Sequence, residues 1–181
     1  MNPRLGEWAC LGILYPAPSH GFAVAAQLKP DGAVGRVWSL SRALTYRSLD
    51  QLSARGSIRA VGEEPGIAGG NRTILAATDR GRAELREWLD TPVAHLRDLR
   101  SELLLKLIIA ELCHIDIGSM LERQHALIEQ MAGALTHPID DQAPVDVVAL
   151  WRSEASQAAL RFLERLPRSS GRPDASMGDA R

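Results

Sequence analysis

Residues 39–51 gather side chains that can form hydrogen bonds to nucleic acid. At helical spacing they include Ser41, Arg42, Tyr46, Arg47, Ser48 and Gln51. An arginine reads guanine or holds a phosphate, a hydroxyl group binds phosphate or a base edge, and a glutamine can pair with adenine. Asn71 and Arg72 form a second group of the same kind further along the chain. On a helix by themselves such residues are usually only a solvated surface; they predict contacts to double-stranded DNA if the elements around them form a DNA-binding fold.

No group of residues predicts catalysis or metal binding. Cys113, His114 and Asp116 stand together, with His125 further on, but a zinc site needs three or four converging ligands. Cys113 falls on the apolar side of a predicted helix and its two neighbours fall at the helix end, so we expect no metal. Residues 66–70 are rich in glycine but lead into a strand, whereas a phosphate-binding loop leads into a helix. The sequence therefore predicts no enzyme and no cofactor.

The composition predicts a globular cytoplasmic protein with balanced charge. The 181 residues include 21 lysines and arginines against 22 aspartates and glutamates. Residues 1–92 have a small basic excess and residues 93–181 an acidic one, so we expect only the first part to meet a polyanion. Neither a secretory leader nor an apolar run of the roughly 20 residues that span a membrane is visible. Cys10 and Cys113 form no spacing motif, which is typical of free thiols in a reducing compartment.

The side chains at 39–51 must be positioned by the helices around them. The first helix is predicted over residues 5–15 and ends at a Pro-Ala-Pro sequence. Ser19 is expected to cap the second helix, with His20 capping locally in the same turn and Phe22 on the inner face. This helix stops before Pro30.

The third helix is predicted over residues 42–55, after an extended segment at residues 34–40. Ser39 or Ser41 offers a capping hydroxyl group at its start. Gly56 stands where a residue with left-handed backbone geometry normally ends a helix.

The hydrophobic pattern then changes to that of strands. Residues 57–62 and 71–78 are predicted as the two strands of a hairpin, because they alternate or carry β-branched residues. A glycine- and proline-rich loop, residues 63–70, joins them, and a helix follows over residues 80–89. Three helices followed by a hairpin is the order of a winged helix-turn-helix, in which the third helix fits the major groove and the hairpin reaches the backbone or the minor groove.

Beyond Pro92 the sequence predicts only helices, over residues 96–112, 117–135 and 145–166. Their apolar residues occupy more than one stripe, which predicts an interface between two copies of the chain. The predicted division is a winged helix-turn-helix DNA-binding domain at 1–92, a helical dimerisation domain at 93–166 and a disordered tail at 167–181.

Several short motifs follow one another between residues 5 and 112. They are Leu11-Gly12-Ile13-Leu14, Ser19-His20-Gly21-Phe22, Val37-Trp38-Ser39-Leu40-Ser41, the set Tyr46, Leu49, Leu52 and Gly56, the strand 72–78, the set Gly81, Leu85 and Trp88-Leu89, and the run Ser101-Glu102-Leu103-Leu104-Leu105-Lys106-Leu107. In this order and spacing they resemble the PadR-like family of bacterial transcriptional regulators.

The resemblance implies a bacterial, cytoplasmic repressor that binds a palindromic promoter site as a homodimer. It also implies that the C-terminal helices pair the subunits and that a small aromatic or hydrophobic effector releases the DNA. Many members begin the recognition helix with a small residue, threonine, leucine and tyrosine, whereas Ala43-Leu44-Thr45-Tyr46 stands here. Leucine and threonine are exchanged, which leaves open whether Leu44 or Thr45 faces the core.

Two sets of site residues follow. The residues predicted to contact DNA are Ser39, Ser41, Arg42, Thr45, Tyr46, Arg47, Asn71 and Arg72, although Tyr46 could instead be a core ring with its hydroxyl at the edge. Trp8, Trp88 and Trp151 could line an effector pocket, or could simply pack in the core or an interface. The alternative function is a winged-helix module that binds protein without sequence-specific DNA binding.

Overall fold

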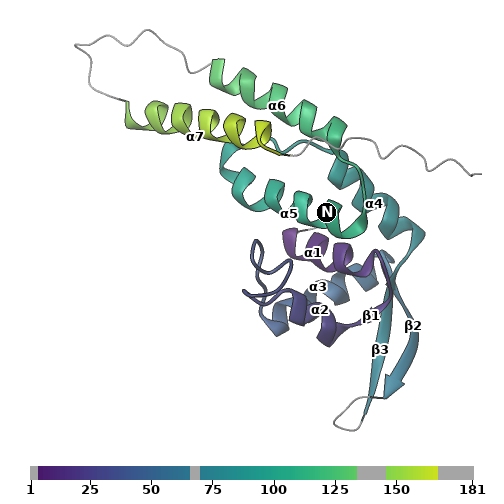
Figure 1. The fold of residues 1–181 in the computed structure, drawn as a ribbon. Helices are drawn as coiled ribbons and strands as arrows, with labels where there is room; N and C mark the ends of the chain where they lie inside the picture. The colour runs from purple at the N-terminus through teal and green to yellow at the C-terminus, as the bar shows by residue number, and fades with distance from the viewer. Residues whose placement is uncertain (1–3, 66–69, 134–145, 167–181) are drawn as a thin grey trace, which may run out of the picture.

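The computed structural model describes residues 4–65, 70–133 and 146–166 (Figure 1). Along the chain the elements are α1 (Leu5–Leu14), β1 (Ser19–His20), α2 (Gly21–Gln27), α3 (Arg42–Ala54), β2 (Ile58–Pro65), β3 (Asn71–Ala77), α4 (Asp79–Asp90), the short helices η1 (Leu96–Asp98) and η2 (Leu99–Leu103), α5 (Leu104–Cys113), α6 (Gly118–Gly133) and α7 (Val147–Glu164). The predicted fold class, a mainly helical winged helix-turn-helix followed by further helices, is confirmed. The predicted tail at 167–181 lies outside the described residues.

The sheet has one strand more than the predicted hairpin. β2 and β3 pair antiparallel, and the short β1 pairs with the other edge of β3 through Ser19 opposite Leu75 and His20 opposite Ile74. The prediction that Ser19 caps α2 is wrong, because α2 begins at Gly21 and the residue directly before it is His20. His20 is the N-cap, and its Nδ1 accepts a hydrogen bond of 3.0 Å from the Ala23 N–H.

Residues 34–40 are not extended as predicted but form a series of tight turns. The Val34 N–H donates to the Gln27 carbonyl, and the Trp38 N–H donates back to the Val34 carbonyl. Gly35 makes this path possible, because a Cβ there would lie 1.8 Å from the Lys29 carbonyl oxygen. These turns pack against the end of α2 and connect it to the start of α3.

The larger core surrounds α1, which is buried over most of its length. It includes Leu11, Leu14, Leu28, Leu52, Ile58, Leu85, Leu89, Leu105 and Ile109. Gly12 lets α5 approach α1 closely, since a Cβ on it would come within 2.3 Å of the Ile109 side chain. Helix α5 therefore packs into the same core as the winged-helix elements, although it follows Pro92.

A smaller core joins η2, α6 and α7 around Val93, Leu103, Met120, Ile128 and Leu163. In Figure 1, α6 and α7 lie side by side at one end of the molecule, and the β2–β3 hairpin projects at the opposite end. The side chain of the buried Gln124 holds the backbone of Val93, the first residue of this core along the chain. The Gln124 side chain accepts a hydrogen bond of 2.6 Å from the Val93 N–H and donates one of 3.1 Å to the Val93 carbonyl.

Lys106 connects the end of α4 to α5 from inside the protein. Its side chain has no exposed surface, and its Nζ donates to the carbonyl oxygens of Trp88 (2.6 Å) and Thr91. The ammonium group also lies 3.5 Å from Glu102 and 4.8 Å from the centre of the Trp88 ring. Burial lowers the pKa of Lys106, and the neighbouring Glu102 carboxylate opposes that shift. The last carbonyl groups of a helix have no partner within it, so Lys106 acts as a buried C-terminal cap of α4.

The two cysteines are free thiols. Burial raises the pKa of Cys10 to about 12 and that of Cys113 to about 11. Both thiols are therefore protonated and poorly nucleophilic near neutral pH. Among the described residues, no three histidine, cysteine, aspartate or glutamate side chains are grouped as metal ligands, and no helix has the length and apolar character to span a membrane.

Candidate nucleic-acid interface

Helix α3 is positioned by a cap at each end and by one buried face. The Ser41 hydroxyl accepts a hydrogen bond of 3.3 Å from the Leu44 N–H, and Gly56 has a φ of +73° just after the last turn. Thr45, Leu49 and Leu52 are buried against the core. The rest of the helix surface is left to face solvent, as a helix that enters a DNA groove requires.

The exchange of leucine and threonine in α3 is resolved by burial. Thr45 has no exposed surface, and its hydroxyl donates a hydrogen bond of 3.1 Å to the Ser41 carbonyl. Leu44, by contrast, is 49% exposed. The prediction that Thr45 contacts DNA is therefore corrected: Thr45 belongs to the core, and Leu44 stands on the surface.

Changing Thr45 to alanine is expected to lower the free energy of unfolding by about 1 kcal/mol, since a buried methyl group and a hydrogen bond are lost. For a chain of this length, that loss lowers the melting temperature by roughly 2–4 °C. Thr45→Val, which keeps the shape and removes only the hydroxyl, is the matched control and should lose less. DNA affinity, measured beside thermal melting, should change in neither variant; a large loss of affinity would contradict the inward orientation.

Two arginines and two aromatic rings meet between α3 and the hairpin. Arg42 lies 5.6 Å from the centre of the Phe22 ring and 5.7 Å from that of Tyr46, and Arg72 lies 5.5 Å from that of Phe22. These four residues, the cation–aromatic cluster, line an open cleft of about 580 Å³. A guanidinium group over a ring face is held there by electrostatic attraction. The cluster thus brings together side chains from α2, α3 and β3.

Phe22 is the member of the cluster whose observed position differs from the predicted one. It was expected on the inner face of its helix but is 50% exposed, because Gly21, Val24 and Ala25 form the buried face of α2. The spacing of those three residues was the available signal, since it leaves Phe22 on the outer side. Tyr46 is partly exposed, with its ring against Gly21: a Cβ there would lie 3.0 Å from Tyr46 Cε1.

Arg72 lies near the loop end of the hairpin, between α2 and β2. The Nε2 atom of His20 lies 3.2 Å from Glu64 Oε1 and 3.4 Å from Arg72 Nη1. Because Nδ1 already accepts the Ala23 N–H, a neutral His20 carries its proton on Nε2 and donates it to Glu64. The Arg72 guanidinium is then left without an acceptor on His20. Asn71 instead donates a hydrogen bond of 2.7 Å to Glu63.

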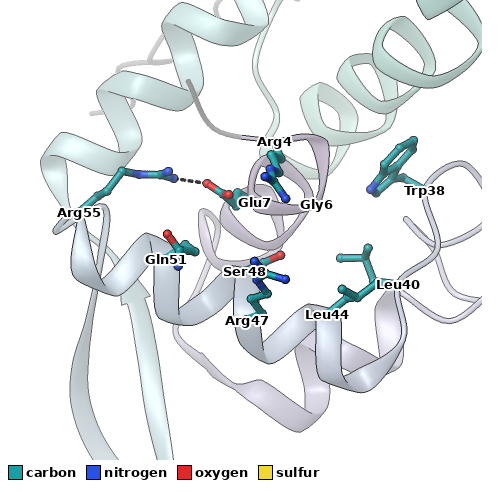
Figure 2. A pocket seen from close by; sticks show the side chains of 10 residues that line it. All are labelled: Arg4, Gly6, Glu7, Trp38, Leu40, Leu44, Arg47, Ser48, Gln51 and Arg55. Carbon is teal, nitrogen blue, oxygen red and sulfur yellow. Dashed lines mark ion pairs between the residues drawn. The ribbon is translucent and has the colours of Figure 1, made fainter. Parts of the chain in front are cut away.

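A second cavity, of about 320 Å³, lies on the other side of α3, against α1. Its lining is drawn in Figure 2 and comprises Arg4, Gly6, Glu7, Trp38, Leu40, Leu44, Arg47, Ser48, Gln51 and Arg55. An ion pair of 2.5 Å between Arg55 and Glu7 closes one end. The indole N–H of Trp38 is directed toward the cavity in Figure 2, and its buried Nε1 has no hydrogen-bond partner among the described residues.

The remaining predicted residues fall in separate places. Ser39 is exposed just before α3, Ser41 is exposed at its cap and Arg47 is exposed on the helix.

The three tryptophans named in the sequence analysis lie in different places. Trp8 and Trp88 stack on each other in the core with centroids 5.1 Å apart, whereas Trp151 is 72% exposed on α7. None of the three lines either of the two cavities described above.

Three helices, a β-hairpin and an exposed cationic third helix define a winged helix-turn-helix protein. Among solved structures, the chain is similar to PadR of Bacillus subtilis in complex with operator DNA, with 18% identity over 89% of this chain and 96% of that chain and a TM-score of 0.47. It is also similar to the same protein in complex with p-coumaric acid (19% identity, 91% and 94%, TM-score 0.42). A third similar structure is smu.1604c of Streptococcus mutans UA159 (17% identity, 88% and 96%, TM-score 0.44).

Neither the models of protein families nor the curated proteins include a match to this chain. Identities of 17–19% carry neither the operator nor the ligand of those proteins over to this chain. The candidate ligands of this chain are therefore inferred from its own surface residues.

Proposed function

We propose that this chain is a PadR-like transcriptional regulator, a repressor that binds a palindromic promoter site as a homodimer. The observation that carries the proposal is the cation–aromatic cluster, in which the exposed Arg42 of α3 and the partly buried Arg72 of the hairpin lie beside the aromatic rings of Phe22 and Tyr46. Residues 1–92 would form the DNA-binding part and residues 93–166 the dimerisation part. The family resemblance of the motifs supports the same reading.

The expected complex places α3 in the major groove and the hairpin beside it. Ser39, Ser41, Arg42, Tyr46 and Arg47 would meet base edges and phosphates, and Asn71 and Arg72 would meet the neighbouring backbone. With a formal net charge of only −1, the chain as a whole is not a polycation. Specific base contacts, doubled by dimer symmetry, would have to supply much of the binding energy.

A salt titration tests this function. Duplexes that bind are first selected from a pool of random sequences, and their affinity is then measured by fluorescence anisotropy at rising salt. We expect a loss on the order of 10³-fold or more between roughly 50 and 200 mM salt, because phosphate contacts release counterions. Failure to select any duplex at low salt would contradict the proposal and would favour a winged-helix module that binds protein.

The first half of α7 carries the apolar surface that we assign to the homodimer. Val147, Val148, Leu150 and Trp151 are all more than half exposed. A contiguous apolar patch of this kind is typical of an interface, and two copies related by a twofold axis would cover each other's patch.

Trp151→Asp is therefore expected to convert the dimer into a monomer, since a charge would be buried in the interface. Light scattering after size exclusion should give twice 19.7 kDa for the wild type and 19.7 kDa for the variant. Val61→Asp, at a residue of β2 that is 44% exposed, is the control and should leave the dimer intact. A wild-type monomer at micromolar concentration would contradict the assignment.

A small aromatic or hydrophobic effector is also part of the proposal, and the cavity between α1 and α3 is its best site. Leu40 and Leu44 supply apolar surface there, and the Trp38 indole N–H has no acceptor within the part of the chain that the structure describes. A ligand in this cavity would contact Arg47. Its binding would therefore lower the affinity for DNA by ~1–3 kcal/mol, or roughly 5–150-fold.

Aromatic compounds are therefore to be screened by quenching of tryptophan fluorescence and then for release of DNA. Trp38→Phe should abolish the response, and Trp151→Phe, outside the cavity, should keep it. Compounds that quench the wild type without changing DNA affinity would contradict an effector role.

A further inference from the structure

Leu44 is an exposed aliphatic side chain on the first turn of the recognition helix. It lies three residues after the cap Ser41 and is 49% exposed, while Thr45 beside it is fully buried. Among the described residues of α3, Leu44 and Tyr46 are the large apolar side chains at the surface. The first turns of such a helix are the part that reaches base edges in a major groove.

The leucine stands at the edge of a cavity that has further apolar surface. It lines the cavity next to α1 together with Leu40, and Figure 2 shows the two side chains near each other. Leu40 itself is close to α1: a Cβ on Gly6 would lie 3.1 Å from its side chain. Arg47 follows one turn later on the same side of the helix and is exposed. Leu44 thus forms an exposed apolar surface beside a cationic one.

We propose that Leu44 reads the C5 methyl group of a thymine in the major groove. The inference rests on the proposed function, since it requires α3 to lie in that groove. Thymine is the base that presents a methyl group on the groove edge, and an apolar side chain recognises it by burying that methyl group. A hydroxyl group at this position would instead seek a phosphate or a polar base edge. The chain should therefore prefer thymine at one position of each half-site, with guanine preferred nearby where Arg47 reaches.

Deoxyuridine substitution tests this inference, because uracil differs from thymine only by the methyl group. In a duplex selected from random sequences, each thymine is replaced in turn by deoxyuridine and the wild-type affinity is measured. We expect one thymine in each half-site at which the replacement lowers affinity about fourfold, the effect of one buried methyl group. Leu44→Ala should bind the thymine and deoxyuridine duplexes equally well. Leu44→Gln, which keeps the length of the side chain, should behave in the same way.

Val61→Ala is the matched control, because Val61 is exposed to a similar degree, 44%, but lies on β2. It should keep the fourfold discrimination at the same thymine. A wild type that binds the selected duplex but distinguishes no thymine from deoxyuridine would overturn the inference and leave the proposed function standing. Discrimination that survives in Leu44→Ala would overturn it as well. If no duplex is bound at all, the proposed function fails and this inference fails with it.

Discussion

Replacing Lys106 by methionine is expected to lower the free energy of unfolding by about 3 kcal/mol, a large effect for one side chain. Methionine fills a similar volume but cannot donate a hydrogen bond. The carbonyl groups of Trp88 and Thr91, both bonded to the Lys106 ammonium group, would lose that donor at the buried end of α4. Glu102 would lose its cationic partner at 3.5 Å. In a chain of this length the melting temperature should fall by roughly 6–12 °C.

The chain provides its own control for this change, because Lys29 is its other lysine and is exposed. Lys29→Met should change the melting temperature little, since it breaks no buried contact. Acetylation of the folded wild type should modify Lys29 and leave Lys106 unmodified. Equal melting temperatures for the two variants, or rapid acetylation of Lys106, would contradict the buried cap.

Arg42→Ala is expected to weaken binding to a selected DNA site by about 1–3 kcal/mol, or roughly 5- to 150-fold. Arg42 stands on the first turn of α3, and its guanidinium group lies beside the rings of Phe22 and Tyr46. Such rings limit the freedom of a long side chain before DNA arrives, so less conformational entropy is lost when it binds a base. Alanine removes the guanidinium group that is proposed to contact a base, and Arg72 remains beside the Phe22 ring.

The comparison with Arg72→Ala separates a base contact from a phosphate contact. Arg42→Ala should lose more affinity for the selected duplex than for a scrambled one, whereas Arg72→Ala should weaken both equally and reduce the salt slope by about 1. Arg97→Ala, in η1, is the matched control and should bind as the wild type does, since its side chain is 79% exposed far along the chain from α3. An Arg42→Ala variant with wild-type affinity would contradict the role given to the cluster.

Local signals in the sequence were sufficient for the elements that carry the residues proposed to contact DNA. The third helix, predicted at 42–55, is observed at Arg42–Ala54, because Ser41 and Gly56 mark its ends through local hydrogen bonding and backbone geometry. The two hairpin strands were likewise predicted from their own residues. By contrast, β1 consists of two residues whose strand geometry depends on a partner more than fifty positions away, so no local pattern indicates it.

The sequence predicted the charged residues of the candidate site but not the aromatic side chain that packs between them. Arg42 and Arg72 could be chosen by type, yet Phe22, which lies between them, was expected inside. The spacing of Gly21, Val24 and Ala25 already places Phe22 on the outer side of α2, so that error was avoidable. The positions of the tryptophans were not: hydrophobic type does not say whether a ring such as Trp8 packs in the core or, like Trp151, stands on a surface. That difference depends on contacts between elements distant in the sequence, which periodicity within one element cannot specify.

Footprinting of the wild-type protein on a duplex selected from random sequences tests the central claim most directly. If two recognition helices related by a twofold axis bind the DNA, two symmetric half-sites should be protected, with centres about 10–10.5 base pairs or a small multiple of that apart. Methylation of guanine N7 at those half-sites should interfere with binding, because that atom lies in the major groove. A single unsymmetrical footprint, or no protection at low salt, would contradict the account of a dimeric winged-helix DNA reader.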